Sequence, residues 1–154
     1  MKPSISNPFF YFFTILTLTL CLSNHSFAQK DIGEIGVIYS KAEADQLYGP
    51  VLISKSIDTK ILSNVLQKIT SYVMFGFKNN NFVITNEYRQ VILSNGISIT
   101  DNDVLSFYSK SKVQELLNLG KDNTTFIEQR SEKLTITNGA YTLEFSVMCP
   151  PTCL

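Results

Sequence analysis

The pattern of apolar and polar positions divides the chain into segments of different period. Residues 9–22 form an unbroken apolar run. Residues 61–69 carry apolar side chains at helical spacing, and residues 141–147 alternate strictly between apolar and polar side chains. A helical period predicts an amphipathic helix, whereas strict alternation predicts a strand with one buried and one solvent-exposed face. We therefore expect helices mixed with strands after the first run.

Three helices are predicted from their caps and apolar stripes. Ser40 and Glu43 have the spacing of a capping box, and Asp58 is a suitable N-cap for a second helix. A third helix is predicted over residues 111–119. The second helix has the strongest stripe, which we expect to pack on a strand over residues 72–77. This stripe consists of Ile61, Leu62, Val65, Leu66 and Ile69.

The remaining periodic segments predict strands. Asn95-Gly96 is a strong hairpin signal, because both residues tolerate positive φ. The last three strands should form an antiparallel meander, so the fold class is α+β: a curled or split antiparallel sheet that ends in a three-stranded C-terminal meander, with two or three helices packed on one face. The predicted strands cover residues 35–39, 51–57, 72–77, 82–85, 89–93, 97–100, 104–108, 125–130, 133–137 and 141–147.

One possible internal repeat is visible. Tyr39-Ser40-Lys41 followed by Leu47 resembles Tyr108-Ser109-Lys110 followed by Leu116, at the same offset. A duplicated strand-helix-hairpin unit explains this similarity, and so do chance matches between two strand-to-helix transitions.

The N-terminal segment has the three parts of a secretory signal peptide. Lys2 is the only charged side chain before residue 30, and the apolar run ends in Ser26-Phe27-Ala28. Such a run is shorter than the ~20 residues of a membrane span. Cleavage is expected between Ala28 and Gln29, with residues 1–28 as the signal, 29–34 as a short leader and 35–154 as a single domain. An uncleaved anchor and acylation of Cys21 are the alternatives.

Composition excludes several classes of function for the chain after the signal. The charges are scattered, with no basic stripe, so no nucleic-acid partner is expected, and no membrane span remains after signal removal. His25 is the only histidine and leaves with the signal, which excludes histidine-based catalysis and imidazole-ligated zinc. High Asn, Ile and Lys usage is typical of a bacterium, so we expect an exported protein, periplasmic or secreted.

The C-terminal cysteines are the sharpest local feature. Cys149 and Cys153 are the two cysteines left after signal removal, and in an oxidising compartment such a pair is normally a disulfide. Cys149-Pro150 with Cys153 also resembles the copper-binding motif of the Sco-type copper chaperones. That resemblance implies Cu(I) bound by Met148, Cys149 and Cys153, although the family's distant histidine ligand has no counterpart here.

The function predicted from these observations is binding without catalysis. Tyr88 and Arg89 lie between two strands and are a candidate surface contact. The partner is expected to be a protein, a peptide or a component of the cell envelope, and no cofactor is expected. A Cu(I) or redox carrier and a histidine-independent hydrolase are the alternatives. Asp101-Asn102-Asp103 departs from a calcium loop and is expected to be a polar turn.

Overall fold

The computed structural model describes residues 33–94, 96–131, 133–144 and 146–149, and for Cys149 the backbone only. These residues belong to one compact unit that begins at Gly33. Its helices are α2 (Lys41–Tyr48), α3 (Thr59–Gln67) and α4 (Lys110–Gly120). Its strands are β1 (Val37–Ser40), β2 (Ile53–Asp58), β3 (Tyr72–Lys78), β4 (Asn81–Asn86), β5 (Val91–Ser94), β6 (Leu105–Ser109), β7 (Thr124–Gln129), β8 (Leu134–Asn138), β9 (Tyr141–Glu144) and β10 (Val147–Cys149).

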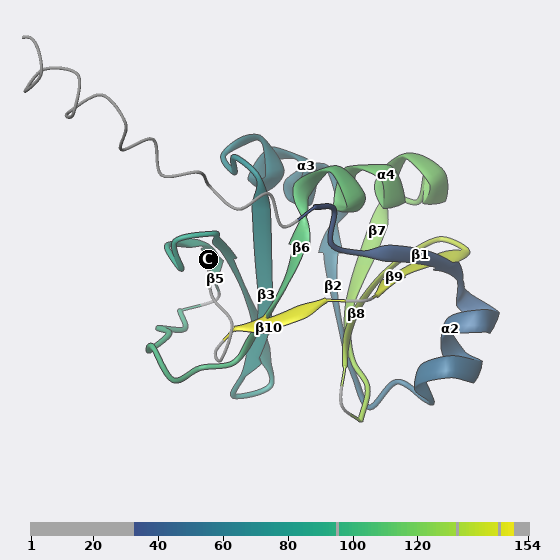
Figure 1. The fold of residues 1–154 in the computed structure, drawn as a ribbon, viewed down its shortest axis with the longest axis horizontal. Coiled ribbons are helices and arrows are strands. Elements are labelled where there is room, and N and C mark those ends of the chain that lie inside the picture. Colours follow the sequence, from purple (N-terminus) through teal and green to yellow (C-terminus); the bar gives the residue numbers. More distant parts are fainter. Residues whose placement is uncertain (1–32, 95, 132, 145, 150–154) are drawn as a thin grey trace, which may run out of the picture. The chain divides into compact units, whose positions relative to one another are not determined.

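The strands form two five-stranded antiparallel sheets (Figure 1). Sheet A has the order β1-β9-β8-β7-β2, and sheet B has the order β10-β6-β3-β4-β5. The predicted α+β class is therefore confirmed, with a split sheet. The C-terminal meander is β7-β8-β9, in which Ile127 lies opposite Ile136 and Ile136 lies opposite Leu143.

Two predicted helix starts are confirmed by their caps. At α2 the Ser40 hydroxyl accepts a hydrogen bond from the Glu43 amide (3.2 Å), and Glu43 Oε2 accepts one from the Ser40 amide (2.8 Å). At α3 the Asp58 carboxylate accepts from the Lys60 and Ile61 amides (2.7 and 3.3 Å). These bonds satisfy amides that have no acceptor within the helix, which is why local sequence could locate both starts.

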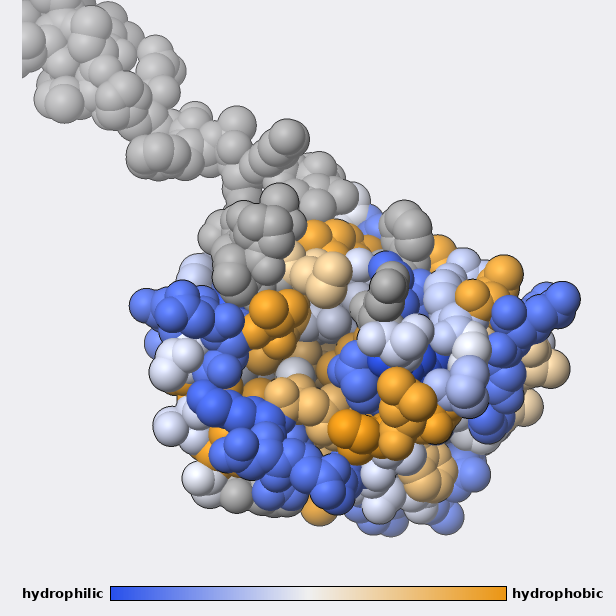
Figure 2. All heavy atoms as spheres, turned by 90° about the horizontal axis from the view of Figure 1, so that it is seen from below, coloured by the Kyte–Doolittle hydropathy of each residue, from blue (hydrophilic) through white to orange (hydrophobic). Residues whose placement is uncertain are grey.

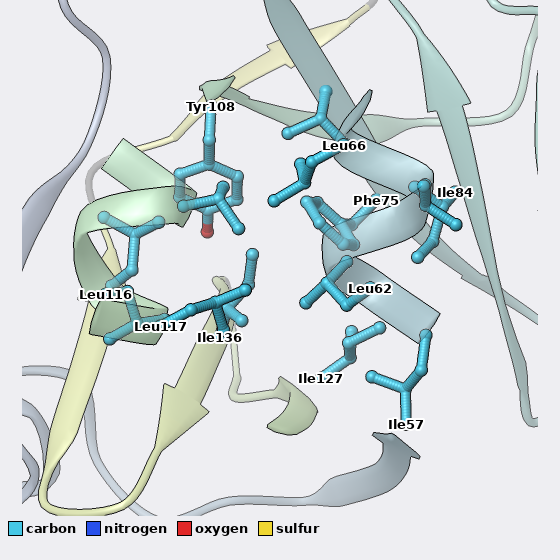
Figure 3. Close-up of a cluster of buried hydrophobic side chains, with 14 of the residues drawn as sticks. Ile57, Leu62, Leu66, Phe75, Ile84, Tyr108, Leu116, Leu117, Ile127 and Ile136 are labelled. Atoms are coloured by element: carbon cyan, nitrogen blue, oxygen red, sulfur yellow. The ribbon is translucent and has the colours of Figure 1, made fainter. Parts of the chain in front are cut away.

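Helices α3 and α4 cover the main hydrophobic core, to which both sheets contribute (Figure 3). Leu62, Leu66 and Leu116 are fully buried and point toward Phe75 of sheet B and Ile136 of sheet A. The prediction that Ile61 belongs to the buried stripe is wrong, because 49% of this residue is exposed. The stripe that does pack inward is Leu62, Val65, Leu66 and Ile69.

The opposite face of sheet B is also apolar. Met74, Val83 and Phe107 belong to a second buried cluster, against which Ile99 of the segment after β5 packs. The run over residues 72–77 lacks alternation because both faces of β3 are covered. This confirms the predicted central buried strand.

Two predicted strands are wrong. Residues 97–100 form no strand, so β5 pairs with β4 and has no hairpin partner beyond Gly96. The alternating run over residues 141–147 is divided: β9 belongs to sheet A, and β10 pairs with β6 in sheet B. The chain thus leaves one sheet for the other within seven residues.

The domain contains a structural duplication in a register that the sequence analysis missed. The order β2-α3-β3-β4-β5 is repeated as β6-α4-β7-β8-β9. Each half ends its second meander strand with the same three residues, Ile84-Thr85-Asn86 and Ile136-Thr137-Asn138. The first strand of each half pairs with the meander of the other half, β2 with β7 and β6 with β3. The similarity between the Tyr39 and Tyr108 segments does not follow this repeat: both segments are strand-to-helix transitions, but β1 has no position equivalent to that of β6 in the repeated order.

Candidate functional site

The predicted surface contact is divided between an exposed residue and a structural one. Tyr88 is 75% exposed, whereas the Arg89 guanidinium donates hydrogen bonds to the carbonyls of Thr100 and Asp103, both at 2.8 Å. Residues 101–103 form the predicted turn. Arg89 therefore fastens the segment between β5 and β6. Hydrophobic and hydrophilic side chains are interspersed on the face shown in Figure 2, so hydropathy marks no docking surface there.

The same turn gives a prediction about pH. Hydrogen bonds from the Lys78 ammonium (2.7 Å) and the Thr100 amide (2.6 Å) lower the pKa of Asp103 to about 2. Because the folded pKa is below the ordinary value of about 4, the stabilisation is present above pH 4 and is lost as pH falls through 2. An NMR titration should give Asp103 a midpoint near 2 that rises in Lys78→Met. A wild-type midpoint near 4 would contradict the described pair.

The tail residues are only partly described. Met148 is 46% exposed on β10, and the Cys149 backbone lies opposite Leu105. The side chain of Cys149, all of Cys153 and the cleavage position at Ala28 and Gln29 lie outside the described residues. Within the described ranges, no three His, Cys, Asp or Glu side chains form a group that could hold a metal ion. No helix in those ranges is long and apolar enough to cross a membrane.

The strongest candidate site is a set of buried polar side chains on the face of sheet A opposite the core. Its members, which we call the polar layer, are Glu128, Arg130, Thr135, Thr137, Thr142 and Glu144. Two cross-strand rows organise this face, because residues at paired positions on neighbouring strands point to the same side. One row contains Val37, Glu144, Thr135, Glu128 and Ser54, and the next contains Tyr39, Thr142, Thr137, Phe126 and Ser56.

Arg130 connects the polar layer to α2. This side chain is fully buried, and its Nη1 donates a hydrogen bond to the Gly49 carbonyl just after α2. Its Nη2 forms an ion pair with Asp45 Oδ1 of α2 at 2.9 Å. Its Nε donates to Thr135 Oγ1 at 3.3 Å. The guanidinium thereby lowers the pKa of the Asp45 carboxyl, to which Lys41 contributes less.

Glu128 is held by a line of hydroxyl groups. Thr137 Oγ1 donates to Glu128 Oε2 at 2.7 Å, and Thr137 and Thr142 share a hydroxyl–hydroxyl bond of 2.9 Å. Arg130 Nη2 lies 3.7 Å from the same Glu128 oxygen. This carboxylate is therefore held by Thr137 on the neighbouring strand β8 and by Arg130, which follows its own strand β7.

Glu144 has weaker partners. It is 1% exposed, yet its Oε1 has no hydrogen-bond partner among the described residues, and the Lys133 ammonium is 3.9 Å away. Tyr48 of α2 lies close by, with its ring 5.8 Å from that of Tyr39. Burial raises the pKa of Tyr48, and hydrogen bonding to Tyr39 and Glu144 raises this pKa further. The site thus contains one buried carboxylate oxygen that lacks a donor.

Exposure changes along the rows. Thr142, Thr135 and Glu144 in the middle of sheet A are buried, whereas Phe126 on β7 and Ser54 on β2 are exposed. This face of sheet A is therefore covered where α2 contacts the polar layer, and it reaches solvent only beyond the layer, toward the β2 edge. The hydroxyl and carboxylate groups of this face can bind a polar ligand without any imidazole.

The sequence did not reveal this site, because the alternation over residues 141–147 was interpreted as a strand whose polar side chains are exposed to solvent. Thr142 and Glu144 are the polar partners of buried Leu143, and both are buried as well. The available signal was Arg130, one of only two arginines, placed two residues after Glu128 on a predicted strand.

Comparison of the chain with models of protein families, with curated proteins and with solved structures finds no match.

Proposed function

We propose that this chain is an exported, non-catalytic binding domain and that the polar layer is its binding surface. The observation that carries the proposal is the burial of three ionisable side chains, Glu128, Arg130 and Glu144, on a face that apolar residues would cover at lower cost. Burying ions is expensive even when they are paired, so stability alone does not account for three of them on this face. The ligand is a polar component of the cell envelope.

The test is whether a ligand is retained through the polar layer. The purified domain, residues 29–154, is mixed with an envelope extract, re-isolated by gel filtration and analysed by mass spectrometry for retained molecules. We expect retention by the wild type and loss in Glu128→Gln. The control Glu115→Gln removes an acid from the α4 surface, where an exposed ion pair contributes little, and should retain the ligand. Equal retention by a folded Glu128→Gln would overturn the proposal.

A histidine-independent hydrolase is the second candidate, favoured by the position of two carboxylates. Glu128 pairs with Thr135, and continuing the β8–β9 register by one residue places Glu144 on the other side of Thr135. Two strand spacings separate their Cα atoms by about 10 Å, and both side chains lie on the same face of the sheet, as the paired carboxyl groups of a glycosidase must. Turnover of a nitrophenyl glycoside that disappears in both Glu128→Gln and Glu144→Gln would establish this alternative.

The export proposal predicts the N-terminus of the mature protein. The described part of the chain is held from its first residues: Tyr72 donates to the Gly33 carbonyl at 3.3 Å, and buried Ile35 exchanges hydrogen bonds with Ser109. Removal of residues 1–28 therefore leaves these contacts intact. The intact mass of the exported protein should correspond to a chain that starts at Gln29. A lipidated chain starting at Cys21, or a chain retaining Met1, would contradict the proposal.

The disulfide proposal for Cys149 and Cys153 predicts that the exported protein has no free thiol. Thiol labelling should fail even after unfolding, because both sulfurs are bonded to each other. The double variant Cys149→Ser/Cys153→Ser should lose about 2 kcal/mol at most, since the closed loop is short. Tight, stoichiometric Cu(I) binding by the reduced wild type, absent in the double variant, would instead favour the copper carrier with Met148 as third ligand.

A further inference from the structure

The unpaired oxygen of Glu144 shows what kind of ligand the polar layer lacks. A carboxylate oxygen buried without a donor costs stability, because water is removed and nothing replaces it. Glu144 Oε1 is in this state, and Lys133 Nζ at 3.9 Å is beyond hydrogen-bond distance. A ligand that donates a hydrogen bond to this oxygen would remove the cost.

The charge balance favours a cation as that donor. The buried acids of the polar layer are Glu128 and Glu144, and its buried base is Arg130, which leaves one negative charge in excess. Asp45 is half-exposed and is paired with Lys41 as well as with Arg130. The Arg130 guanidinium already contacts Gly49, Thr135 and Asp45. A bound anion would face the Glu128 and Glu144 carboxylates. Arg130 Nη2 has no aligned hydrogen bond among the described residues, but its charge is already paired with Asp45 and Glu128. A bound cation would balance the charge.

The site already attracts an ammonium group from the chain itself. The Lys133 side chain is 39% exposed, and its ammonium stands at the edge of contact with Glu144. A lysine side chain of this kind can turn its charged end into water at little cost. The paired rings of Tyr39 and Tyr48 stand beside the same carboxylate, and aromatic rings attract compact cations.

We infer that the polar layer binds the primary ammonium group of a small organic cation, which donates to Glu144 Oε1 in place of Lys133. This inference rests on the proposed binding function and assigns its ligand class. Entry requires displacement of α2, whose one buried residue is Ala44. Its other described contacts with sheet A are the polar contacts of Asp45, Tyr48 and Gly49 and the ring contact between Tyr48 and Tyr39.

The probe is 1,4-diaminobutane, titrated into residues 29–154 by NMR at low salt. The wild type should show saturable shifts at β9 and α2, and butane-1,4-diol, which lacks the charge, should show none. Glu144→Gln should weaken diamine binding roughly tenfold or more, as expected for loss of a charge-assisted hydrogen bond. Glu115→Gln should bind as the wild type does, which controls for attraction to surface acids.

Lys133→Gln provides a readout of opposite sign. Removing the internal competitor should tighten diamine binding several-fold, a change that general damage to the fold would not produce. This variant keeps the inference testable even where Glu144→Gln is poorly folded. Absence of saturable diamine binding, or binding that Lys133→Gln leaves unchanged or weakens, would overturn the inference. If the domain instead retains a ligand without an ammonium group, and this retention is lost in Glu128→Gln, the ligand class is wrong but the proposed binding function stands.

Discussion

Replacement of Arg130 by methionine is expected to lower the free energy of unfolding by about 3–5 kcal/mol, the cost of breaking a buried ion pair by removing one partner. Methionine fills most of the volume but leaves the Gly49 carbonyl without its donor and the Asp45 and Glu128 carboxylates without their ion-pair partner. The measurement is equilibrium unfolding in urea, monitored by far-UV circular dichroism.

The control is the other arginine. Arg89→Met also removes a guanidinium that donates to two backbone carbonyls, but those carbonyls belong to an exposed turn that water can reach. Arg89→Met should therefore lower the free energy of unfolding by only about 1 kcal/mol. Equal losses in the two variants would show that the Arg130 environment is not the dry one described.

Leu66→Ala is expected to cost about 2–5 kcal/mol, because a fully buried leucine leaves a cavity when it is truncated. Leu66 points into the core between Phe75 and Tyr108 (Figure 3). Ile61 lies on the same helix and is 49% exposed, so Ile61→Ala provides a matched truncation without a cavity. Its loss should stay below about 1 kcal/mol. A smaller loss for Leu66→Ala than for Ile61→Ala in the same urea melts would reverse the assigned packing.

The features predicted correctly from sequence are those that neighbouring residues decide. Ser40 with Glu43, and Asp58 with the amides that follow it, start their helices through bonds across three positions. The meander β7-β8-β9 follows from short turns and alternation. The prediction that Ile61 is buried was wrong, because helical spacing locates an apolar stripe on α3 but does not show how wide a face of the helix the other elements cover.

The candidate site depended on a contact that no local pattern encodes. Alternation over residues 141–147 separated two faces of β9 correctly, but the polar face is covered by α2, which lies about 100 positions earlier in the chain. The strand also ends at Glu144, where the chain crosses to sheet B. The strand predicted after Asn95-Gly96 failed for a similar reason. Residues 97–100 form no strand, and the Thr100 backbone is instead bonded to Arg89 and Asp103.

The exchange of first strands between the two halves has a consequence for how the chain folds. β2 is completed by β7, with Ile53 opposite Gln129, and β1 is completed by β9, with Val37 opposite Glu144. Sheet A cannot close until β7 and β9 are present, so its contact order is high and its formation should be slow and cooperative. Sheet A of a nascent chain would therefore stay incomplete until β9 has been made.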